Sequence, residues 1–281
     1  MTFHLGIDGG GTGCRAALAG EDRRVLGRGM AGPANIASDP EGALRSILTA
    51  ARAALADAGL TEGELPRLRA GLGLAGANAS GTVERLRAAL PFASVRIETD
   101  AVAAVKGALA DEDGIVAALG TGSVFGIQRG GRVRQIGGWG LVLGDEGSGA
   151  WIGRALLSRA LRAVDGFVPM TALLREVVAE HGGPEGVVTF SLGAKPVGFA
   201  RFAPRVMESS DPAALAIMGR ATADVAEAVD LLQAGEGLPV VLLGGLGPAY
   251  AERLAGRWTL RPPRGSALDG ALWLAYEGAG P

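Results

Sequence analysis

The sequence has few of the residues on which several common chemistries depend. Cys14 is its one cysteine, which excludes a disulfide framework, a cysteine-rich zinc site and a protein-held iron–sulfur cluster. His4 and His181 are its two histidines and lie far apart in the chain, so a Ser-His-Asp triad or a histidine metal site finds little support. The Gly-Lys-Ser/Thr segment of the Walker A motif is also absent. Any phosphate group would therefore need another kind of loop to bind it.

A strong net charge and long apolar runs are missing too. The formal net charge of −2 creates no field that would attract nucleic acid or an anionic membrane surface. No run of 18 apolar residues occurs, and the chain opens without the basic and apolar regions of a signal peptide. With 48% hydrophobic and 20% charged residues, the 281-residue chain is typical of one large or two medium compact domains. We expect a reducing, cytoplasmic location.

Glycine is abundant, and a first cluster of it lies in the segment LGIDGGGTGCRAAL, from Leu5 to Leu18. An apolar strand ends at Asp8, and a turn containing four glycines and Thr12 leads into a second strand. Because glycines leave the backbone open, the N–H groups of Gly10 and Gly11 and the Thr12 hydroxyl could converge on a phosphate. Asp8 could hold a hydrated Mg²⁺ beside it. An ordinary hairpin turn is the alternative interpretation.

A second turn repeats this arrangement about 110 residues further on. Predicted strands at 115–119 and 124–128 flank it, and a third strand follows at about 133–136. The turn itself consists of Gly120, Thr121, Gly122 and Ser123. Two such turns facing each other across a cleft would hold a triphosphate from both sides, which makes the pair a more specific signal than either turn alone.

Three polar residues are candidates for binding a substrate. Asp100 ends a predicted strand and opens a helix, so it caps that helix, or acts chemically at the carboxyl edge of a sheet, or does both. Asn35, in the loop AGPANIASDP, is either a turn residue or a ligand-binding residue. Asp145 lies in a glycine-rich loop that enters a helix near Ser148, and the density of glycine and acid there favours contact with a ligand over a helix-start role.

The remaining pattern predicts an α/β protein with two domains, residues 1–110 and 111–281, joined by a hinge at 111–114. The expected helices are 40–58, 81–90, 100–110, 211–234 and 267–276, and several short helices are expected within an insertion at about 167–210. The other expected strands are 24–30, 68–74, 94–98, 239–243 and 258–260. We expect Trp139 and Trp151 to pack inside the protein rather than to bind a sugar.

Two further glycine motifs have competing interpretations. Gly71, Gly73 and Gly76 match the G-x-G-x-x-G fingerprint of dinucleotide binding, but the glycines begin inside a predicted strand instead of following it. We therefore keep NAD binding only as a weak alternative. Gly244 and Gly245 follow a buried strand, and they form either a plain strand-to-helix turn or a backbone surface under an adenosine.

Taken in order, the motifs DGGGTG, GPANI, TDAVAA, GTGS, GDEGSGAWIG and LLGGLG resemble those of a known family. This is the BadF/BadG/BcrA/BcrD-type ATPase and N-acetylglucosamine kinase group of the actin-like superfamily, and the sequence looks most like its bacterial glucosamine kinases. The resemblance implies two ribonuclease-H-like lobes around an interdomain cleft, with ATP and Mg²⁺ as cofactors. It also implies phosphoryl transfer to the 6-hydroxyl of an amino sugar, no nucleic-acid or membrane partner, and allows a homodimer.

Carried over motif by motif, the resemblance assigns a role to each candidate. Asp100 would be the catalytic base, and Asp8 would hold Mg²⁺ through water. The residues that would bind phosphate are Gly10, Gly11, Thr12, Gly120, Thr121, Gly122 and Ser123, those beneath the adenosine are Gly244 and Gly245, and those at the sugar are Asn35, Asp100, Asp145 and Gly149.

The identity of the substrate stays open at this point. We expect glucosamine, with N-acetylglucosamine as the alternative. In the loop expected to contact the substrate, this chain has Gly-Ala-Asn at 76–78. The N-acetylglucosamine kinases of animals, which it otherwise resembles, have Ser-Gly-Gly there. This difference leaves recognition of the N-acetyl group open. A non-sugar ATPase that drives a partner protein is the alternative from another functional class, although the dehydratase-activating ATPases need cluster-binding cysteines that this chain lacks.

Overall fold

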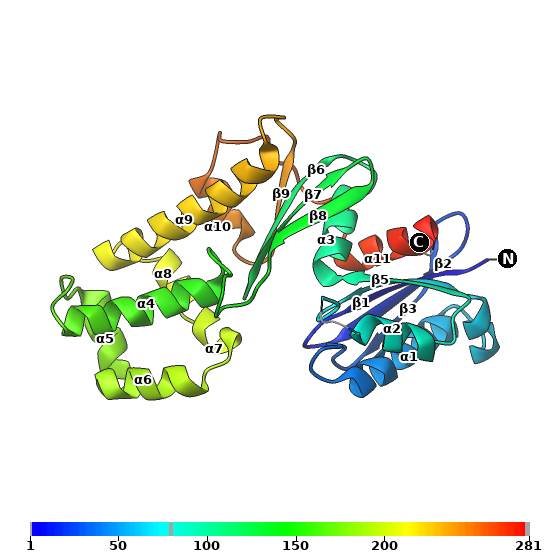
Figure 1. Ribbon diagram of the computed structural model, residues 1–281, viewed down its shortest axis with the longest axis horizontal. Helices are drawn as coiled ribbons and strands as arrows, with labels where there is room; N and C mark the ends of the chain where they lie inside the picture. The colour runs from blue at the N-terminus through cyan, green and yellow to red at the C-terminus, as the bar shows by residue number, and fades with distance from the viewer. Residues whose placement is uncertain (1, 79–80, 279–281) are drawn as a thin grey trace. The chain divides into compact units, whose positions relative to one another are not determined.

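A computed structural model of the chain describes residues 2–78 and 81–278. The chain forms two α/β units, whose helices and strands are labelled in Figure 1. The first unit comprises the described parts of residues 1–114, 126–135 and 262–281, and the second comprises 115–125 and 136–261. The first break lies close to the expected boundary at residue 110. The C-terminal segment, which we expected in the second domain, groups instead with the first unit.

The first unit contains a five-stranded sheet in the order β3-β2-β1-β4-β5. Its strands are β1 (His4–Gly9), β2 (Cys14–Ala19), β3 (Val25–Ala31), β4 (Arg69–Leu74) and β5 (Ser94–Thr99). The first three strands form an antiparallel meander, and β4 and β5 continue the sheet parallel to β1. Because β1, β4 and β5 are parallel, their carboxyl ends meet at one edge of the sheet, which is where side chains for binding and catalysis gather in such folds.

Helices cover both faces of this sheet. Both faces of β2 carry apolar side chains, which pack against helices on either side. Ala16 and Leu18 belong to the core beneath α1 (Pro40–Asp57), whereas Ala17 and Ala19 pack with Leu268 and Leu272 of α11 (Ala267–Glu277). The helices α2 (Thr82–Ala89) and α3 (Asp100–Leu109) complete the unit, together with the 3₁₀ helix η1 (Glu62–Arg67). Successive residues of a strand face opposite sides of the sheet, so β2 serves two cores.

The packing of α11 also explains the fingerprint glycines. A Cβ on Gly71 would lie 2.2 Å from the carbonyl oxygen of Ala271, and one on Gly73 would lie 2.3 Å from the Cβ of Ala103 in α3. These glycines therefore permit helices to approach β4 closely. This packing role accounts for Gly71 and Gly73 without a dinucleotide.

The second sheet has the order β8-β7-β6-β9, and β6 and β9 are parallel. Its strands are β6 (Gly114–Leu119), β7 (Ser123–Arg129), β8 (Arg132–Gly137) and β9 (Val240–Leu243). The helices of the second unit are α4 (Gly149–Val164), α5 (Ala172–Glu180), α6 (Pro184–Gly193), α7 (Pro196–Ala200), α8 (Ala203–Met207), α9 (Pro212–Gln233) and α10 (Gly247–Arg253). The expected insertion of short helices thus corresponds to α5 through α8.

Two expectations about local structure are wrong. The strand expected at 258–260 is reduced to an isolated bridge between Val240 and Leu260, because two prolines follow after Arg261 and cannot donate to a sheet. Trp139 does not pack inside the protein, since it is 72% exposed. At the segment expected to be a hinge, the carbonyls of Ala110 (2.9 Å) and Glu112 (2.8 Å) accept from Nε2 of Gln128, and the hinge itself stays a prediction.

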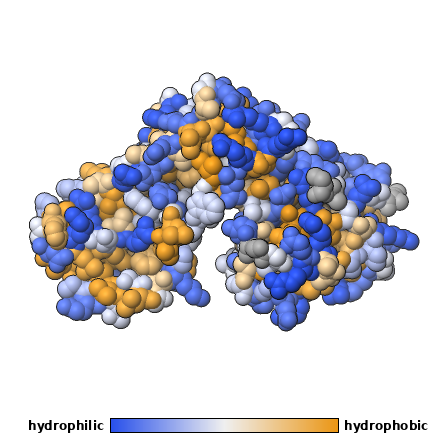
Figure 2. Space-filling view, in the orientation of Figure 1, coloured by the Kyte–Doolittle hydropathy of each residue, from blue (hydrophilic) through white to orange (hydrophobic). Residues whose placement is uncertain are grey.

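On the face shown in Figure 2, hydrophobic residues form patches between hydrophilic ones. Val142 and Leu143, in the same glycine-rich loop as Trp139, are also strongly exposed. None of the helices formed by the described residues combines the length and apolar character of a bilayer-spanning segment.

Candidate functional site

The first glycine turn lies just beyond the carboxyl end of β1. The Gly10 N–H donates to the carbonyl of Gly13 (2.9 Å), which closes the turn, and the Gly10 carbonyl accepts from Ala34 N (2.9 Å). Gly11 and Thr12 are exposed at the tip, and no protein atom lies within 4 Å of the place that a Gly11 side chain would occupy. The tip is therefore fixed at its base and open at its end, where an anion can approach the backbone.

Asp8 and Asp100 lie at the same edge of the first sheet, at the ends of β1 and β5, with β4 between these strands. Burial raises the pKa of Asp8, and the negative charge of Asp100 raises it further. Arg15, directly opposite Asp8 on β2, acts in the other direction and lowers this pKa. Two carboxylates that repel each other at one edge form a site that a cation would stabilise.

This carboxylate pair is compatible with a hydrated Mg²⁺. Among the described residues, no three His, Cys, Asp or Glu side chains converge in a way that would bind a metal ion directly. Mg²⁺ usually keeps several waters and needs only one or two carboxylates besides the phosphates of a substrate. Asp8, with Asp100 as a second negative charge nearby, provides that donor chemistry.

Asp100 does not cap α3. The N-cap is Thr99, whose Oγ1 accepts from Val102 N (3.2 Å) and also donates to Gln135 Oε1 (3.1 Å). The carboxylate of Asp100 accepts the neighbouring Ala101 N–H (2.9 Å), which belongs to the first turn of α3. Its side chain reaches solvent, yet the protein around it desolvates the carboxyl enough to raise its pKa. Asp100 is therefore not the N-cap residue, although it satisfies a first-turn N–H, and its role in chemistry stays a prediction.

Asn35 has the turn role that the sequence allowed. Its Oδ1 accepts from Ala37 N (3.0 Å) and Ser38 N (3.1 Å), so that the amide nitrogen is the group left for a ligand. Gly76, in the loop after β4, has φ +84°, and a Cβ there would lie 2.8 Å from this same Oδ1. The loops after β3 and β4 are thus fitted to each other at the carboxyl edge of the sheet.

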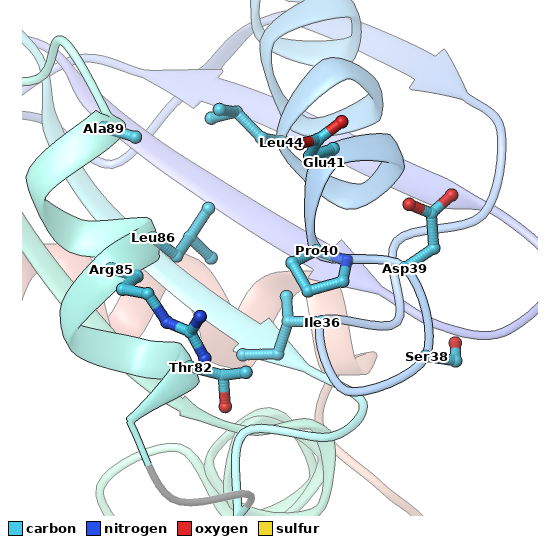
Figure 3. Close-up of a pocket in the computed structure, with 10 residues that line it drawn as sticks. All are labelled: Ile36, Ser38, Asp39, Pro40, Glu41, Leu44, Thr82, Arg85, Leu86 and Ala89. Atoms are coloured by element: carbon cyan, nitrogen blue, oxygen red, sulfur yellow. The ribbon is translucent and has the colours of Figure 1, made fainter.

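A cavity of about 490 Å³ lies beside Asn35, between the start of α1 and one side of α2. It is lined by Ile36, Ser38, Asp39, Pro40, Glu41, Leu44, Thr82, Arg85, Leu86 and Ala89. Figure 3 shows Arg85 and Leu86 on α2 facing Ile36 and Pro40. Sequence reasoning missed this cavity, because each helix carries an ordinary amphipathic pattern and only the fold brings the two surfaces together.

The second glycine turn, in the second unit, rests on the start of α4. The N–H groups of Gly149 and Ala150 donate to the carbonyls of Gly120 (2.8 Å) and Thr121 (3.1 Å). Ser123 is held by a bond from its hydroxyl to the carbonyl of Glu146 (2.8 Å). The turn is thereby fixed from below, while Thr121 stays exposed.

Asp145 lies against this second turn. It is 8% exposed and adopts φ +61°, a conformation that side chains other than glycine rarely adopt. A Cβ on Gly122 would lie 2.9 Å from its Oδ2, so any larger residue at 122 would displace the carboxylate of Asp145. Burial raises the pKa of Asp145, and backbone N–H groups of Ser123 and Gly140 counteract part of that rise. A buried acid on strained backbone beside a ligand turn is typical of functional sites.

Two further contacts complete the second unit's part of the site. Gly244 has φ +84°, and a Cβ there would lie 2.3 Å from the carbonyl oxygen of Leu119, the residue before the second turn. Gly245 is exposed beside it. The hydroxyl of Tyr250, which is fully buried, donates to the carbonyl of Gly147 (2.6 Å) and fixes the loop that carries Asp145.

Each unit thus gathers its own share of the candidates that the sequence predicted. The first brings together Asp8, Gly10, Gly11, Thr12, Asn35 and Asp100, and the second brings together Gly120, Thr121, Gly122, Ser123, Asp145, Gly149, Gly244 and Gly245. Sequence reasoning missed Arg15, Thr99 and Tyr250. Of these three, only Arg15 could have been predicted from the sequence, because the expected hairpin places it opposite Asp8.

Known proteins are similar to this chain over nearly its whole length. The sequence pattern of the BadF/BadG/BcrA/BcrD ATPase family matches residues 5–254. A glucosamine kinase of Vibrio cholerae is 32% identical over 284 residues, which cover 98% of this chain and 96% of the relative. An N-acetylmuramic acid/N-acetylglucosamine kinase of Clostridium acetobutylicum is 31% identical over 171 residues, which cover 59% of this chain and 55% of the relative.

Solved structures are also similar to this chain. The crystal structure of a proposed N-acetylglucosamine kinase from Chromobacterium violaceum matches with a TM-score of 0.83 and 33% identity. The match covers 98% of this chain and 99% of the other. It confirms the expected α/β fold class with two ribonuclease-H-like lobes.

Proposed function

Because the chain belongs to the BadF/BadG/BcrA/BcrD ATPase family, we propose that it is an ATP-dependent glucosamine kinase that phosphorylates the 6-hydroxyl of the sugar. Both curated relatives are sugar kinases, which supports the general class. The choice of glucosamine rests on the Vibrio cholerae relative, which aligns along almost the full chain. The observation that carries the proposal is the placement of Asp100, which is not the N-cap residue of α3, at the same sheet edge as Asp8 and the first glycine turn.

Asp100 acts as the general base in this proposal. Phosphoryl transfer needs little covalent chemistry from a protein, and requires mainly in-line placement and neutralised charge. The carboxylate of Asp100 accepts the proton of the 6-hydroxyl as that oxygen attacks the γ-phosphorus. Burial raises the pKa of Asp100, which makes its carboxylate a stronger base than an ordinary surface aspartate.

The two glycine turns bind the phosphates of ATP through backbone N–H groups and the hydroxyls of Thr12 and Thr121. This arrangement replaces the lysine of a Walker A loop with backbone dipoles. Asp8 would hold Mg²⁺ through water, and the ion would neutralise charge on the phosphates. Gly244 and Gly245 lie beneath the adenosine.

The residues proposed for sugar binding are Asn35 and Asp100 in the first unit and Asp145 and Gly149 in the second. The amide nitrogen of Asn35 donates to a sugar hydroxyl, and Asp100 and Asp145 accept from others. Gly149, the first residue of α4, is included because its motif matches a sugar-site position of the family that the sequence resembles. N-acetylglucosamine is the second candidate substrate, favoured by the Clostridium acetobutylicum relative and by the Chromobacterium violaceum structure.

A substrate panel tests the proposal. Purified protein is incubated with Mg²⁺ and ATP and with glucosamine, N-acetylglucosamine, glucose or no sugar, and ADP release is followed by a coupled assay. We expect ADP release to depend on the sugar, with the highest kcat/KM for glucosamine. A higher kcat/KM for N-acetylglucosamine would move the assignment to that sugar. ATP hydrolysis that no sugar stimulates would contradict the kinase and favour an ATPase that drives a partner protein.

A further inference from the structure

A second cavity, distinct from the candidate active site, lies in the second unit between α4 and α9. Its volume is about 250 Å³, and three arginines line it: Arg159 and Arg162 from α4, and Arg220 from α9. We call it the arginine cavity. Trp151 and Ser158 also line it from α4. The α4 residues are spaced at 151, 158, 159 and 162, so that they share one face of the helix.

The positive charge in the arginine cavity is only partly balanced. Arg220 pairs with Asp224, whose carboxylate lies 2.8 Å from its Nε. The guanidinium of Arg162 lies over the ring of Phe167, 5.1 Å from its centroid. In the parts of the chain that the structure describes, neither Arg159 nor Arg162 has a carboxylate within 4.0 Å. Glu227 and Glu146 act on Arg220 from further away, so that the guanidinium groups of Arg159 and Arg162 are the ones left without a paired carboxylate among the described residues.

Arg159 supplies the sharper observation. Its Nε is buried and has no hydrogen-bond partner among the described groups. A buried donor left without a partner destabilises the folded state, and does so more strongly when the group is charged. An arginine in this position is therefore expected to have a partner that is not part of the described chain.

We propose that the arginine cavity binds the phosphate group of a small molecule. Guanidinium groups present planar pairs of N–H donors that match phosphate oxygens, and the Ser158 hydroxyl can add one more donor. The indole of Trp151 offers an apolar surface for an organic group attached to the phosphate. No residue assigned above to ATP or to the sugar lines this cavity, so the inference does not depend on the proposed function.

A calorimetric titration with inorganic phosphate at low ionic strength tests the proposal. The double variant Arg159→Gln, Arg162→Gln is compared with the control Arg175→Gln, Arg201→Gln, which removes two exposed arginines of the same unit. Phosphate binding at the glycine turns would be retained in both variants, so the difference between them isolates the arginine cavity. We expect the double variant to lose the binding event attributed to the cavity, or to weaken it at least tenfold, while the control keeps it.

Equal phosphate affinity in these two variants would overturn the proposal. Circular dichroism and the unfolding temperature establish that each variant is folded. If the double variant does not fold, Arg162→Gln alone is compared with Arg175→Gln, because Arg162 is exposed and its loss leaves no buried group behind. A threefold or greater loss of affinity in Arg162→Gln alone supports the arginine cavity, and no difference from Arg175→Gln overturns it.

Two further titrations identify the source of the phosphate group. Glucosamine 6-phosphate binding more tightly than inorganic phosphate, with the advantage lost in Trp151→Phe, assigns the cavity to a phosphorylated sugar. Equal affinities that Trp151→Phe leaves unchanged assign it to free phosphate. Citrate binding as tightly as phosphate would overturn the assignment to a phosphate group. Sedimentation velocity tests whether a second copy of the chain occupies the cavity instead. If the wild type is a dimer and the double variant is a monomer with unchanged phosphate binding, a second copy covers the cavity and the phosphate proposal is wrong.

Discussion

The carboxylate of Asp100 is the residue on which the proposed chemistry depends most. Asp100→Asn keeps the size of the side chain and its position at the start of α3, but it cannot accept a proton. We expect kcat to fall about 100-fold or more, which is within the usual range for losing a general base. The Kd for ATP should stay close to that of the wild type, because the glycine turns are intact. Steady-state kinetics and calorimetry measure the two quantities.

Asp111→Asn is the matched control for this substitution. Asp111 is exposed and follows α3 in the same unit. Its substitution also removes one negative charge, but at a place distant from the sheet edge that carries Asp8. It should leave kcat unchanged. Near-normal turnover in Asp100→Asn would remove Asp100 from the role of base.

The raised pKa of Asp100 leads to a second prediction, for the pH dependence of stability. Because its pKa is higher in the folded than in the unfolded chain, the folded state binds the proton more tightly. Stability is therefore lost as the pH rises from the unfolded to the folded pKa. Asp100→Asn should raise the unfolding temperature relative to the wild type at about pH 7, and much less at about pH 4 or below. An equal shift at both pH values in thermal unfolding would contradict the raised pKa.

At the scale of single residues, the sequence correctly placed Asp8 and Asp100 at the ends of strands, because each follows an apolar run. The roles of Asp8, Asp100 and Asp145 in binding and catalysis stay predictions. The cap of α3 was misplaced by one residue, since Thr99 and Asp100 are both good caps and sequence does not fix where a helix begins. The turn bonds of Asn35 confirm one of the two roles that the sequence allowed, and its role at a ligand stays a prediction.

Between residues and the whole fold, the loop before α4 depends on one buried hydroxyl. Tyr250→Phe removes the hydrogen bond to the carbonyl of Gly147 and leaves that carbonyl without its buried donor. We expect a loss of about 1–3 kcal/mol in the free energy of unfolding. Because this loop carries Asp145, the KM for the sugar should rise as well. Denaturant unfolding and steady-state kinetics measure both effects.

The chain provides a control for this prediction in its other tyrosine. The hydroxyl of Tyr276 donates to the carbonyl of Gly20 (2.7 Å) in the first unit, away from the candidate site residues. Tyr276→Phe removes a comparable hydrogen bond, so it should lower stability without changing KM. A KM that both variants change equally would mean that Tyr250 acts through general stability and not through the loop.

A buried ion pair fastens α11 to the first unit. The ammonium of Lys106 in α3 is 1% exposed, and it donates to the carbonyl of Gly131 (2.6 Å) and to the carboxylate of Glu277. Glu277→Gln removes the charge that balances Lys106. We expect a loss of about 1–3 kcal/mol in the free energy of unfolding, below the 3–5 kcal/mol of a fully buried pair because Glu277 is partly exposed.

Lys106→Met is the informative comparison. Methionine fills a similar volume without a charge, and Glu277 keeps its second partner, Arg96, at 2.7 Å. The loss of stability should therefore be smaller than in Glu277→Gln. Urea unfolding of the two variants checks the order, and a larger loss in Lys106→Met would show that the attraction outweighs the cost of burying the charge.

At this same scale, local pattern predicted almost every helix and strand, because the apolar spacing and the capping residues of each are strong. It could not show where α11 packs. The apolar residues of that helix would suit either sheet, and the match is decided by β4, where Gly71 leaves room for the backbone at Ala271. Contacts of this kind join residues about 200 positions apart, beyond the reach of periodicity.

For the molecule as a whole, the residue pattern predicted an α/β protein with two domains, and the resemblance to a family implied the two ribonuclease-H-like lobes. The repeated Gly-Thr-Gly turn agrees with this fold, because each copy lies in a sheet whose strands follow the same order, β3-β2-β1-β4 in one and β8-β7-β6-β9 in the other. The substrate was beyond such reasoning. Surfaces assembled from separate elements, such as the cavity between α1 and α2, are not recorded in any single motif, and recognition of a substrate depends on surfaces of that kind.

The last prediction concerns the use of both units by one nucleotide. Thr12 and Thr121 are the exposed hydroxyls of the two glycine turns, one in each unit. If ATP contacts both turns, Thr12→Val and Thr121→Val should each raise its Kd about 3–10-fold, the usual effect of losing a hydrogen bond to a charged group. Thr61→Val, at an exposed threonine whose side chain caps no helix, should leave the Kd unchanged. A Kd that responds to only one of the two turns would show that the triphosphate is held by one unit, and the proposal that ATP joins the two would then be wrong.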